Sequence, residues 1–135
     1  MIVFAVLDTN VLVSAFLKSE SVPGDVVREA LEGRIIPLTN EEILKEYEAV
    51  LGRKKFKIDS SERTRFLNGF RKRAIILEGF AVDEVFSDET DAVFFEVVMK
   101  AREMTEAYLV TGNMKHFPVR PFVVTPRQML EILDM

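Results

Sequence analysis

Short apolar runs alternate with amphipathic segments along this chain of 135 residues. The first run, Ile2–Leu7, is continuously apolar, which is typical of a strand buried on both faces of a parallel sheet. Further short runs at 35–38, 107–110 and 122–124 predict strands of the same kind. The segments between them carry apolar residues at helical spacing. The pattern therefore predicts an α/β fold, a three-layer α/β/α sandwich around a mainly parallel sheet, in a single domain over residues 1–135.

Helix boundaries follow from capping residues, prolines and glycines. A capping residue or a proline opens most of the expected helices, and glycine ends two of them. Ala74–Leu77 and Phe80–Phe86 are two apolar stretches, and at least one is expected to be a strand. A polar, basic connection is expected at 53–60, and Ser61 is the expected cap of the helix after it. The expected helices cover residues 11–16, 23–33, 40–51, 61–72, 88–104 and 126–133.

The composition excludes several classes of protein. The chain has no cysteine, so disulfides, thiolate zinc sites and cysteine nucleophiles are excluded. No apolar run approaches the roughly 20 residues that span a bilayer. The chain also reaches Asp8 without the basic region that opens a signal peptide. We therefore expect a cytoplasmic protein with no membrane partner.

The charge is distributed unevenly along the chain. The overall net charge is −4, but residues 53–73 hold nine basic and two acidic residues, so this segment is +7 and the remainder is −11. A cationic stretch on an otherwise anionic protein is suited to a phosphate backbone. The alternative is a solvated helix face on which basic residues are neighbours by chance.

The first predicted strand ends at Asp8, followed by Thr9 and Asn10. In an open α/β sheet, ligands bind at the carboxyl ends of the strands, so Asp8 is expected at the rim of a crevice. Asp, Thr and Asn also cap helices well, and capping alone is the alternative interpretation.

Glu46 lies in the helix expected at 40–51. At 100° per residue it falls at the edge of the apolar stripe, beside Ile43 and Val50, whereas Lys45 and Glu48 fall farther from its centre. A carboxylate at this border can reach into a crevice. The alternative is a surface glutamate in an acidic helix.

Asp91 lies near the start of the helix expected at 88–104. Phe94, Phe95 and Val98 follow at helical spacing, so Asp91 heads a row that faces inward. A buried acid is costly unless a cation faces it. The helix dipole also favours an acid here, so structural capping is the alternative. Asp88 is the expected cap and a candidate supporting residue.

Asn113 follows another predicted strand, with Gly112 easing the turn, although Asn is common in turns for its own reasons. Three carboxylates and a carboxamide form an oxygen-only donor set of the kind that Mg²⁺ or Mn²⁺ prefers. Such ions activate water for in-line displacement at a phosphodiester. His116 is the only histidine, and a lone loop histidine is more often a surface residue than a base.

Segments spanning nearly the whole chain resemble the PIN domain family, and within it the VapC-like toxin components of prokaryotic toxin–antitoxin pairs. They occur in the family's order. The matching segments are Val6–Phe16, Glu42–Leu51, Asp88–Asp91 with Phe94–Glu96, Ala107–Asn113 and Val124–Pro126.

The resemblance implies a metal-dependent endoribonuclease with the catalytic residues Asp8, Glu46 and Asp91, which with Asn113 would bind Mg²⁺ or Mn²⁺. Thr9, Asn10, Ser14 and Thr111 match supporting polar positions. The resemblance also implies a homodimer and an antitoxin partner. The residues of the basic segment that we expect to bind the RNA substrate are Arg53, Lys54, Lys55, Lys57, Arg71, Lys72 and Arg73.

Asn113 departs from the wider family, which most often has Asp there. An amide oxygen is a weaker, neutral ligand, so a second metal ion is expected to bind poorly. In a one-metal mechanism Asp8 and Asp91 bind the ion, and Glu46 binds it or orients the water.

Two alternatives stay open. A catalytically weak or inactive PIN-fold module would bind RNA or a protein partner without cutting. A nucleotide-binding or phosphotransfer domain would share the doubly wound sheet, but the chain lacks the glycine-rich and Walker motifs of such domains.

Overall fold

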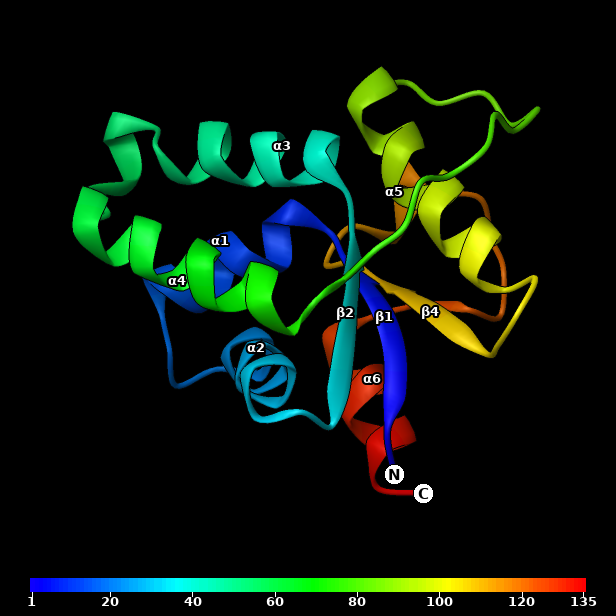
Figure 1. Ribbon diagram of the computed structural model, residues 1–135, viewed down its shortest axis with the longest axis horizontal. Coiled ribbons are helices and arrows are strands. Elements are labelled where there is room, and N and C mark those ends of the chain that lie inside the picture. Colours follow the sequence, from blue (N-terminus) through cyan, green and yellow to red (C-terminus); the bar gives the residue numbers. More distant parts are fainter.

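The computed structural model describes residues 1–135 and contains one five-stranded sheet in which every pairing is parallel. The strand order is β3-β2-β1-β4-β5, so β1 is the central strand (Figure 1). This arrangement confirms the predicted fold class. The strands are β1 (Val3–Leu7), β2 (Ile35–Thr39), β3 (Ile75–Ile76), β4 (Ala107–Val110) and β5 (Val123–Val124).

Six α-helices surround this sheet, with α1, α2 and α4 on one side of β1 and β2 and α5 on the other (Figure 1). No helix has both the length and the apolar character required to cross a membrane. Two short 3₁₀ helices cover Lys54–Phe56 and Met114–His116. The α-helices are α1 (Thr9–Leu17), α2 (Val22–Glu32), α3 (Glu41–Leu51), α4 (Ser60–Arg73), α5 (Glu89–Ala101) and α6 (Pro126–Leu133).

The central strand is apolar along its length because helices cover both of its faces. Ala5, Val6 and Leu7 have no exposed surface, and they belong to a hydrophobic core of 31 buried residues. Two aligned pairs fix the register, Ala5 with Pro37 of β2 and Ala5 with Tyr108 of β4. Since β1 lies between β2 and β4 in a parallel sheet, its carboxyl end and theirs meet at one edge, where Asp8 follows directly.

The segment before α5 contains the strand expected of at least one of its two apolar stretches. Of the two apolar stretches, only Ile75–Ile76 forms a strand, and residues 80–86 contain none. Phe86 instead packs its ring against Phe95 and Phe117, with centroids 5.7 and 6.3 Å away. Its side chain reaches the core without any pairing of the backbone, so an apolar run alone does not establish a strand here.

Helix limits also differ from the prediction, and three of these differences have a clear structural cause. The first helix begins at Thr9 rather than at residue 11, because the Asp8 side chain caps it. Asp59, not Ser61, caps α4. The fifth helix ends at Ala101 rather than at residue 104, where Arg102 turns the chain towards β4 by donating a hydrogen bond to the Ala107 carbonyl at 2.6 Å.

Candidate active site

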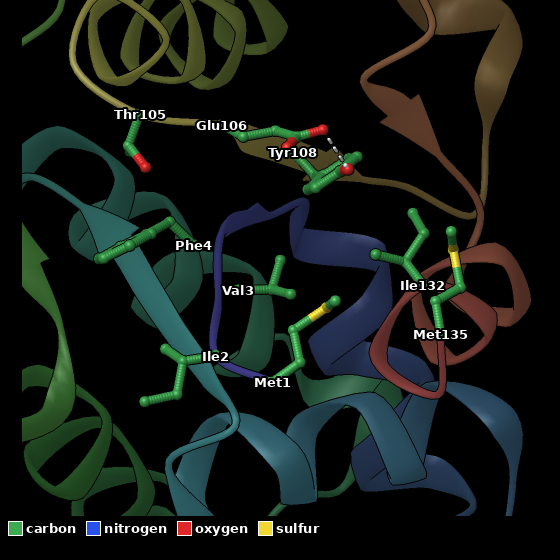
Figure 2. Close-up of a pocket in the computed structure, with 9 residues that line it drawn as sticks. All are labelled: Met1, Ile2, Val3, Phe4, Thr105, Glu106, Tyr108, Ile132 and Met135. Carbon is green, nitrogen blue, oxygen red and sulfur yellow. Dashed lines mark hydrogen bonds between the residues drawn. The ribbon is translucent and has the colours of Figure 1, made fainter.

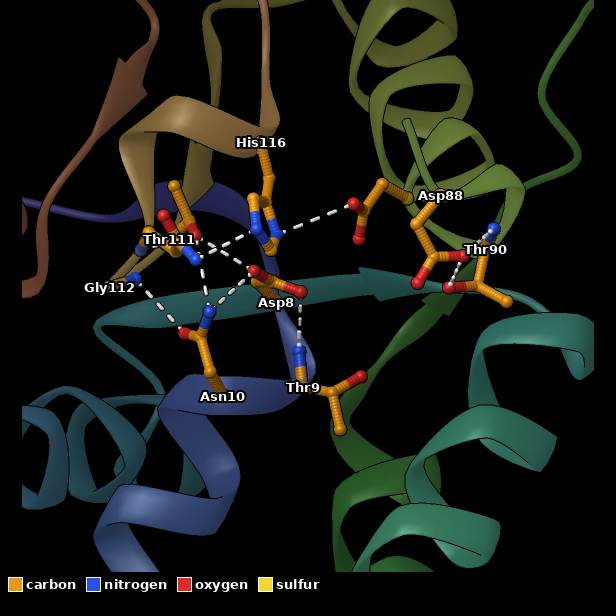
Figure 3. A network of polar contacts seen from close by, with 10 residues as sticks. Asp8, Thr9, Asn10, Asp88, Thr90, Thr111, Gly112 and His116 are labelled. Atoms are coloured by element: carbon orange, nitrogen blue, oxygen red, sulfur yellow. Dashed lines mark hydrogen bonds and ion pairs between the residues drawn. The ribbon is translucent and has the colours of Figure 1, made fainter. Parts of the chain in front are cut away.

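Asp8 is held rigidly at the carboxyl end of β1 (Figure 3). Its Oδ1 accepts a hydrogen bond from the Thr9 backbone N–H at 2.8 Å. Its Oδ2 accepts from Asn10 Nδ2 at 2.8 Å and from Thr111 Oγ1 at 2.7 Å. The Asp8 backbone N–H donates to the Val110 carbonyl at the end of β4, at 2.9 Å. Strand β1, helix α1 and the turn after β4 therefore all fix the orientation of this buried carboxylate.

The turn after β4 is locked onto α1 by the same network. The Gly112 N–H donates to Asn10 Oδ1 at 2.9 Å, and the Asn113 N–H donates to Thr111 Oγ1 at 2.9 Å. Thr111 is fully buried behind Asp8. A Cβ on Gly112 would lie 3.3 Å from Asn10 Oδ1, which is a tight contact, so glycine suits this close approach.

Asp91 lies in the first turn of α5, and the inward-facing row that it heads is buried. Asp88 caps this helix by accepting hydrogen bonds from the Thr90 backbone N–H at 3.0 Å and the Thr90 hydroxyl at 2.8 Å. Asp91 Oδ2, by contrast, is buried with no hydrogen-bond partner. The His116 Nδ1 atom lies 3.5 Å from it. Asp91 is thus an acid buried without the partners that normally offset such burial.

Glu46 reaches the site from α3, where it is half-buried at the border of the apolar face. The next residue, Tyr47, is fully buried and donates a hydrogen bond from its hydroxyl to the Leu7 carbonyl. Its ring packs edge-on against Phe70, with centroids 5.6 Å apart. Tyr47 therefore ties α3 to the last residue of β1, directly before Asp8, and so holds Glu46 near it.

The three acids and Asp88 line one open cavity of about 350 Å³. Two residues expected at the site contact it only through others. Thr111 contacts the cavity-lining Asp8 and Asn10, and Asn113 contacts His116 and Thr111. Neither lines the cavity itself, and of the expected RNA-binding residues only Arg53 does. The polar, basic and aromatic residues that do line it are Thr9, Asn10, Ser14, Arg53, Phe56, Thr90, Phe94 and His116.

The neighbouring acids in the cavity destabilise the charged form of Asp91. Burial, and then the charge of Asp8, are the largest causes that raise the pKa of Asp91 from 3.8 to about 6; Asp88 and Glu46 contribute smaller increases, and His116 opposes them. Burial also raises the pKa of Asp8, against the hydrogen bonds from Thr111 and Thr9. The hydrogen bonds from Thr90 lower the pKa of Asp88. A divalent cation would relieve the burial cost and the repulsion together.

The donor set fits a hard cation by its chemistry, because carboxylate and amide oxygens are the ligands that Mg²⁺ and Mn²⁺ prefer. The unpartnered Asp91 Oδ2 provides an oxygen that is free to coordinate. The acids do not form a finished coordination sphere, however, since no three His, Asp or Glu side chains converge closely enough to hold a metal ion.

The basic segment is divided between two places. Arg53 lies at the cavity beside α3, whereas Arg71 at the far end of α4 pairs with Glu41, at 2.5 and 2.7 Å. Arg73 donates to the Leu31 and Gly69 carbonyls, at 2.6 and 3.1 Å. The 14 residues of α4, about 21 Å, separate the two groups. The expected residues away from the cavity are Lys54, Lys55, Lys57, Arg71, Lys72 and Arg73.

Two contributors to the site were not found by sequence reasoning. The sequence places His116 in a loop, but the 3₁₀ turn Met114–His116 brings its ring into the cavity. Tyr47 is counted as part of an apolar stripe, although its hydroxyl is the group that ties α3 to β1. A signal for each was present, since Tyr47 is the stripe's only polar member and His116 lies three residues after Asn113.

A second cavity, of about 290 Å³, lies at the other end of β1 and lacks this chemistry (Figure 2). Its walls are mainly apolar, with Met1, Ile2 and Met135 among them. Its only carboxylate, Glu106, accepts a hydrogen bond from the Tyr108 hydroxyl at 2.9 Å. The acid-lined cavity is therefore the candidate active site.

Comparisons with known proteins agree with this fold. The sequence profile of a PIN domain matches residues 5–115, a range that includes Asp8, Glu46, Asp91 and Asn113. The chain is 26% identical over 111 residues to the uncharacterised protein MJ1680 of Methanocaldococcus jannaschii, a match that covers 80% of this chain and 69% of that protein. The crystal structure of PAE2754 from Pyrobaculum aerophilum superposes with a TM-score of 0.54 at 20% identity, covering 98% of this chain and 90% of that one, which shows a shared fold. The chain belongs to the PIN domain family, whose members are generally nuclease-like.

Proposed function

We propose that this protein is an endoribonuclease that uses Mg²⁺ or Mn²⁺ to hydrolyse phosphodiester bonds of RNA. One observation carries the proposal: Asp8, Glu46 and Asp91 come from three separate elements and line one cavity. Burial, together with the neighbouring acids, raises the pKa of Asp91, so keeping this carboxylate charged in the cavity costs folding free energy. Acids are held together against such a cost where their charge serves a function.

The residues have distinct roles in this proposal. Asp8 and Asp91 bind the ion, and Asn113 offers its amide oxygen. Glu46 binds the ion or orients the attacking water. The hydrogen bonds from Asn10 and Thr111 keep the Asp8 oxygens in place. When bound, the ion lowers the pKa of a water molecule and stabilises the charge that develops on the phosphate.

The substrate would enter past Arg53 and Phe56, which lie together at the cavity. Arg53 is suited to a phosphate and the half-buried Phe56 ring to an unpaired base, because stacking on an aromatic ring tolerates any base. Lys55 Nζ lies 5.2 Å from the centroid of that ring. Lys57 ends this turn in the left-handed conformation, at φ 54°, and uncommon backbone of this kind is concentrated at functional sites.

The biological setting that we propose rests on the resemblance to toxin components. In that setting the protein is the cytoplasmic toxin of a toxin–antitoxin pair and forms a homodimer. A cognate antitoxin protein holds it inactive. The remaining basic residues of the segment, Lys54, Lys55, Lys57, Arg71, Lys72 and Arg73, extend the RNA path away from the cavity.

The test is cleavage of labelled RNA by the purified protein in Mg²⁺ or Mn²⁺, compared with EDTA. Asp8→Asn and Asp91→Asn are expected to abolish cleavage. Asp83→Asn is the matched control, because Asp83 is exposed and outside the cavity, and it is expected to cut like the wild type. Unchanged rates in both site variants would refute the assignment of the site.

Two features favour a second candidate, a module that binds RNA without cutting it. Asn113 replaces the acid usual in the family, and the site acids do not converge on one point. The same assay separates the two functions. Binding of RNA in EDTA, with no metal-dependent cleavage by any form, would favour the module.

A further inference from the structure

Another cavity, of about 410 Å³, adjoins the acid cavity and is called here the Lys115 cavity. Side chains from 84–87, before α5, and from 115–118, in and after the turn that follows β4, line it. His116 lines both cavities, and its Nδ1 lies 3.5 Å from Asp91 Oδ2 (Figure 3). Arg53 lines only the acid cavity. In Figure 1 the turn after α3 and the segment before α5 lie on opposite sides of the molecule, so the Lys115 cavity leaves the acids in a different direction from the entrance at Arg53.

Two contacts fix the walls of the Lys115 cavity. Arg120 Nη2 donates a hydrogen bond to Glu84 Oε1 at 3.1 Å, which joins the two walls by an ion pair. Beneath the surface, the rings of Phe86 and Phe117 pack together with their centroids 6.3 Å apart. The irregular segment before α5 is therefore held against the turn after β4, and the space between them is a fixed feature of the fold.

The charge of the Lys115 cavity differs from that of the acid cavity. Glu84 is its only carboxylate, and Arg120 already pairs with it. Lys115 is exposed and takes part in none of the ion pairs, so no partner offsets its positive charge. The acids repel the phosphates of a substrate, and an unpaired cation beside them attracts the chain of phosphates that the acids alone would reject.

The other side chains that line the Lys115 cavity suit the remaining parts of a nucleotide. Val85 is 96% exposed and Pro118 is half-buried, so both present apolar surface. Ser87 adds an exposed hydroxyl. Apolar side chains pack on the face of a base, and hydroxyls bond to sugar and phosphate. Base faces are free in an unpaired strand, whereas a duplex keeps them stacked on each other.

We propose that the Lys115 cavity is a second RNA subsite, which binds the part of an unpaired strand that lies beyond the acids as seen from Arg53. Lys115 contacts a phosphate there, and Val85 and Pro118 contact a base. This inference rests on the proposed function and deepens it. A strand that is held on both sides of the acids is cut at an internal bond, and it is single-stranded where it is cut.

The first test measures RNA binding in EDTA with the full chain. Lys115→Gln removes the charge, and Lys115→Arg keeps it. Lys18→Gln is the matched control, because Lys18 is an exposed lysine that lines neither cavity. We expect Lys115→Gln to reduce the slope of log affinity against log salt by about 0.7, the value of one phosphate contact on a single strand. Lys115→Arg and Lys18→Gln are expected to keep the wild-type slope.

The second test locates the bound strand. The backbone amide signals of the metal-free protein are recorded by ¹⁵N NMR as a short single-stranded RNA is added. We expect shifts at 84–87 and 115–118 as well as at 53–56, and smaller shifts at 84–87 and 115–118 with a duplex of the same sequence. In Lys115→Gln the shifts at 84–87 are expected to shrink, while those at 53–56 stay as in the wild type.

Two results would overturn the proposal. One is a wild-type salt slope in Lys115→Gln. The other is that single-stranded RNA leaves the signals at 84–87 and 115–118 unchanged while it shifts those at 53–56. Failure of the proposed function is a separate outcome, in which the wild type cuts no RNA in Mg²⁺ or Mn²⁺. Because both tests are made without metal, they then still decide whether the Lys115 cavity binds RNA.

Discussion

Asp8 and Asp91 share one cavity but are held in opposite ways at the scale of single residues. The two oxygens of Asp8 accept three hydrogen bonds, whereas Asp91 Oδ2 accepts none. Hydrogen bonds from the protein therefore position Asp8, whereas Asp91 Oδ2 is buried without a hydrogen-bond donor. Substitutions at and around the two residues should accordingly affect stability in different ways.

Asp91→Asn should stabilise the metal-free protein near neutral pH. Because folding raises the pKa of Asp91 from 3.8 to about 6, the associated stability is complete below pH 4 and is lost as the pH rises through 6. The Asn variant carries no charge, so we expect a gain of about 1–3 kcal/mol in unfolding free energy at pH 7 and none at pH 4. Urea unfolding in EDTA between pH 4 and pH 7 measures the unfolding free energy of both proteins. If it changed with pH in the same way for the wild type and for Asp91→Asn, the expectation would be contradicted.

Thr111→Val should destabilise the protein and disturb Asp8. The hydroxyl of this fully buried residue donates to Asp8 Oδ2 and accepts from the Asn113 N–H, and valine of nearly the same shape can do neither. We expect a loss of about 1–3 kcal/mol in unfolding free energy, together with slower RNA cleavage. Thr64→Val on the exposed face of α4 is the control. Equal stability of the two variants would show that the hydrogen bonds of the Thr111 hydroxyl make no net contribution to the unfolding free energy.

The positions of the main acids follow from rules that act along the chain. A carboxylate after a buried strand lies at the sheet's carboxyl edge, and a residue three and four positions before Phe94 and Phe95 shares their face. His116 could not be found in this way. Its contacts with Asp91 and Asn113 depend on a three-residue 3₁₀ turn whose path no periodicity encodes.

Among the elements, the placement of α3 depends on Tyr47. Tyr47→Phe keeps the ring that packs on Phe70 and removes the hydrogen bond to the Leu7 carbonyl. We expect a loss of about 1–2 kcal/mol in unfolding free energy, and a lower kcat at nearly unchanged KM because Glu46 moves with the helix. The control, Tyr108→Phe, removes a hydroxyl that contacts only the side chain of Glu106. A larger change in KM than in kcat would place Tyr47 in RNA binding instead.

The junction between α1 and α2 allows only glycine at position 24. A Cβ there would lie 2.0 Å from the Ser19 carbonyl oxygen. This oxygen belongs to the backbone, so it could move away only if the loop between α1 and α2 were distorted. Gly24→Ala is expected to lower the unfolding free energy by about 3 kcal/mol. Gly69→Ala in α4 is the matched control, because its nearest neighbour is the flexible Arg73 side chain at 3.7 Å, and helix propensity there favours Ala by up to about 1 kcal/mol. Thermal unfolding of both variants measures the difference, and equal stability of Gly24→Ala and Gly69→Ala would contradict the expectation.

The order and type of most elements could be predicted because each of them buries a face whose period appears in the sequence. The six helices and four of the strands follow that logic, with β1 central and apolar throughout, whereas both residues of the edge strand β3 are exposed. Residues 80–86 are an exception to this rule, because Val82 and Phe86 pack on the core as single side chains from an irregular segment. Whether such a run pairs with a sheet depends on whether a free edge strand lies beside it in the fold. The sequence of the run alone does not give this information.

At the scale of the whole molecule, the excess of positive charge divides into two groups with different surroundings. Arg53 lines the acid cavity, and the exposed Lys54 and Lys55 follow it along the chain without lining the cavity. At the other end of α4, Arg71 and Arg73 already engage Glu41 and backbone carbonyls. Their charges still attract a phosphate backbone, but their side chains are partly committed to the fold.

The two groups should respond differently to salt and to the length of the RNA. For binding measured in EDTA, Lys54→Gln with Lys55→Gln is expected to reduce the slope of log affinity against log salt by about 1.4 for RNA of any length, at about 0.7 per phosphate contact. Arg71→Gln with Lys72→Gln should reduce it only for RNA long enough to span the roughly 21 Å of α4. Equal effects on short RNA would place both groups at the cavity. No effect of either pair would leave Arg53 and Phe56 as the only RNA contacts of the +7 segment and would make the rest of that segment a solvated surface.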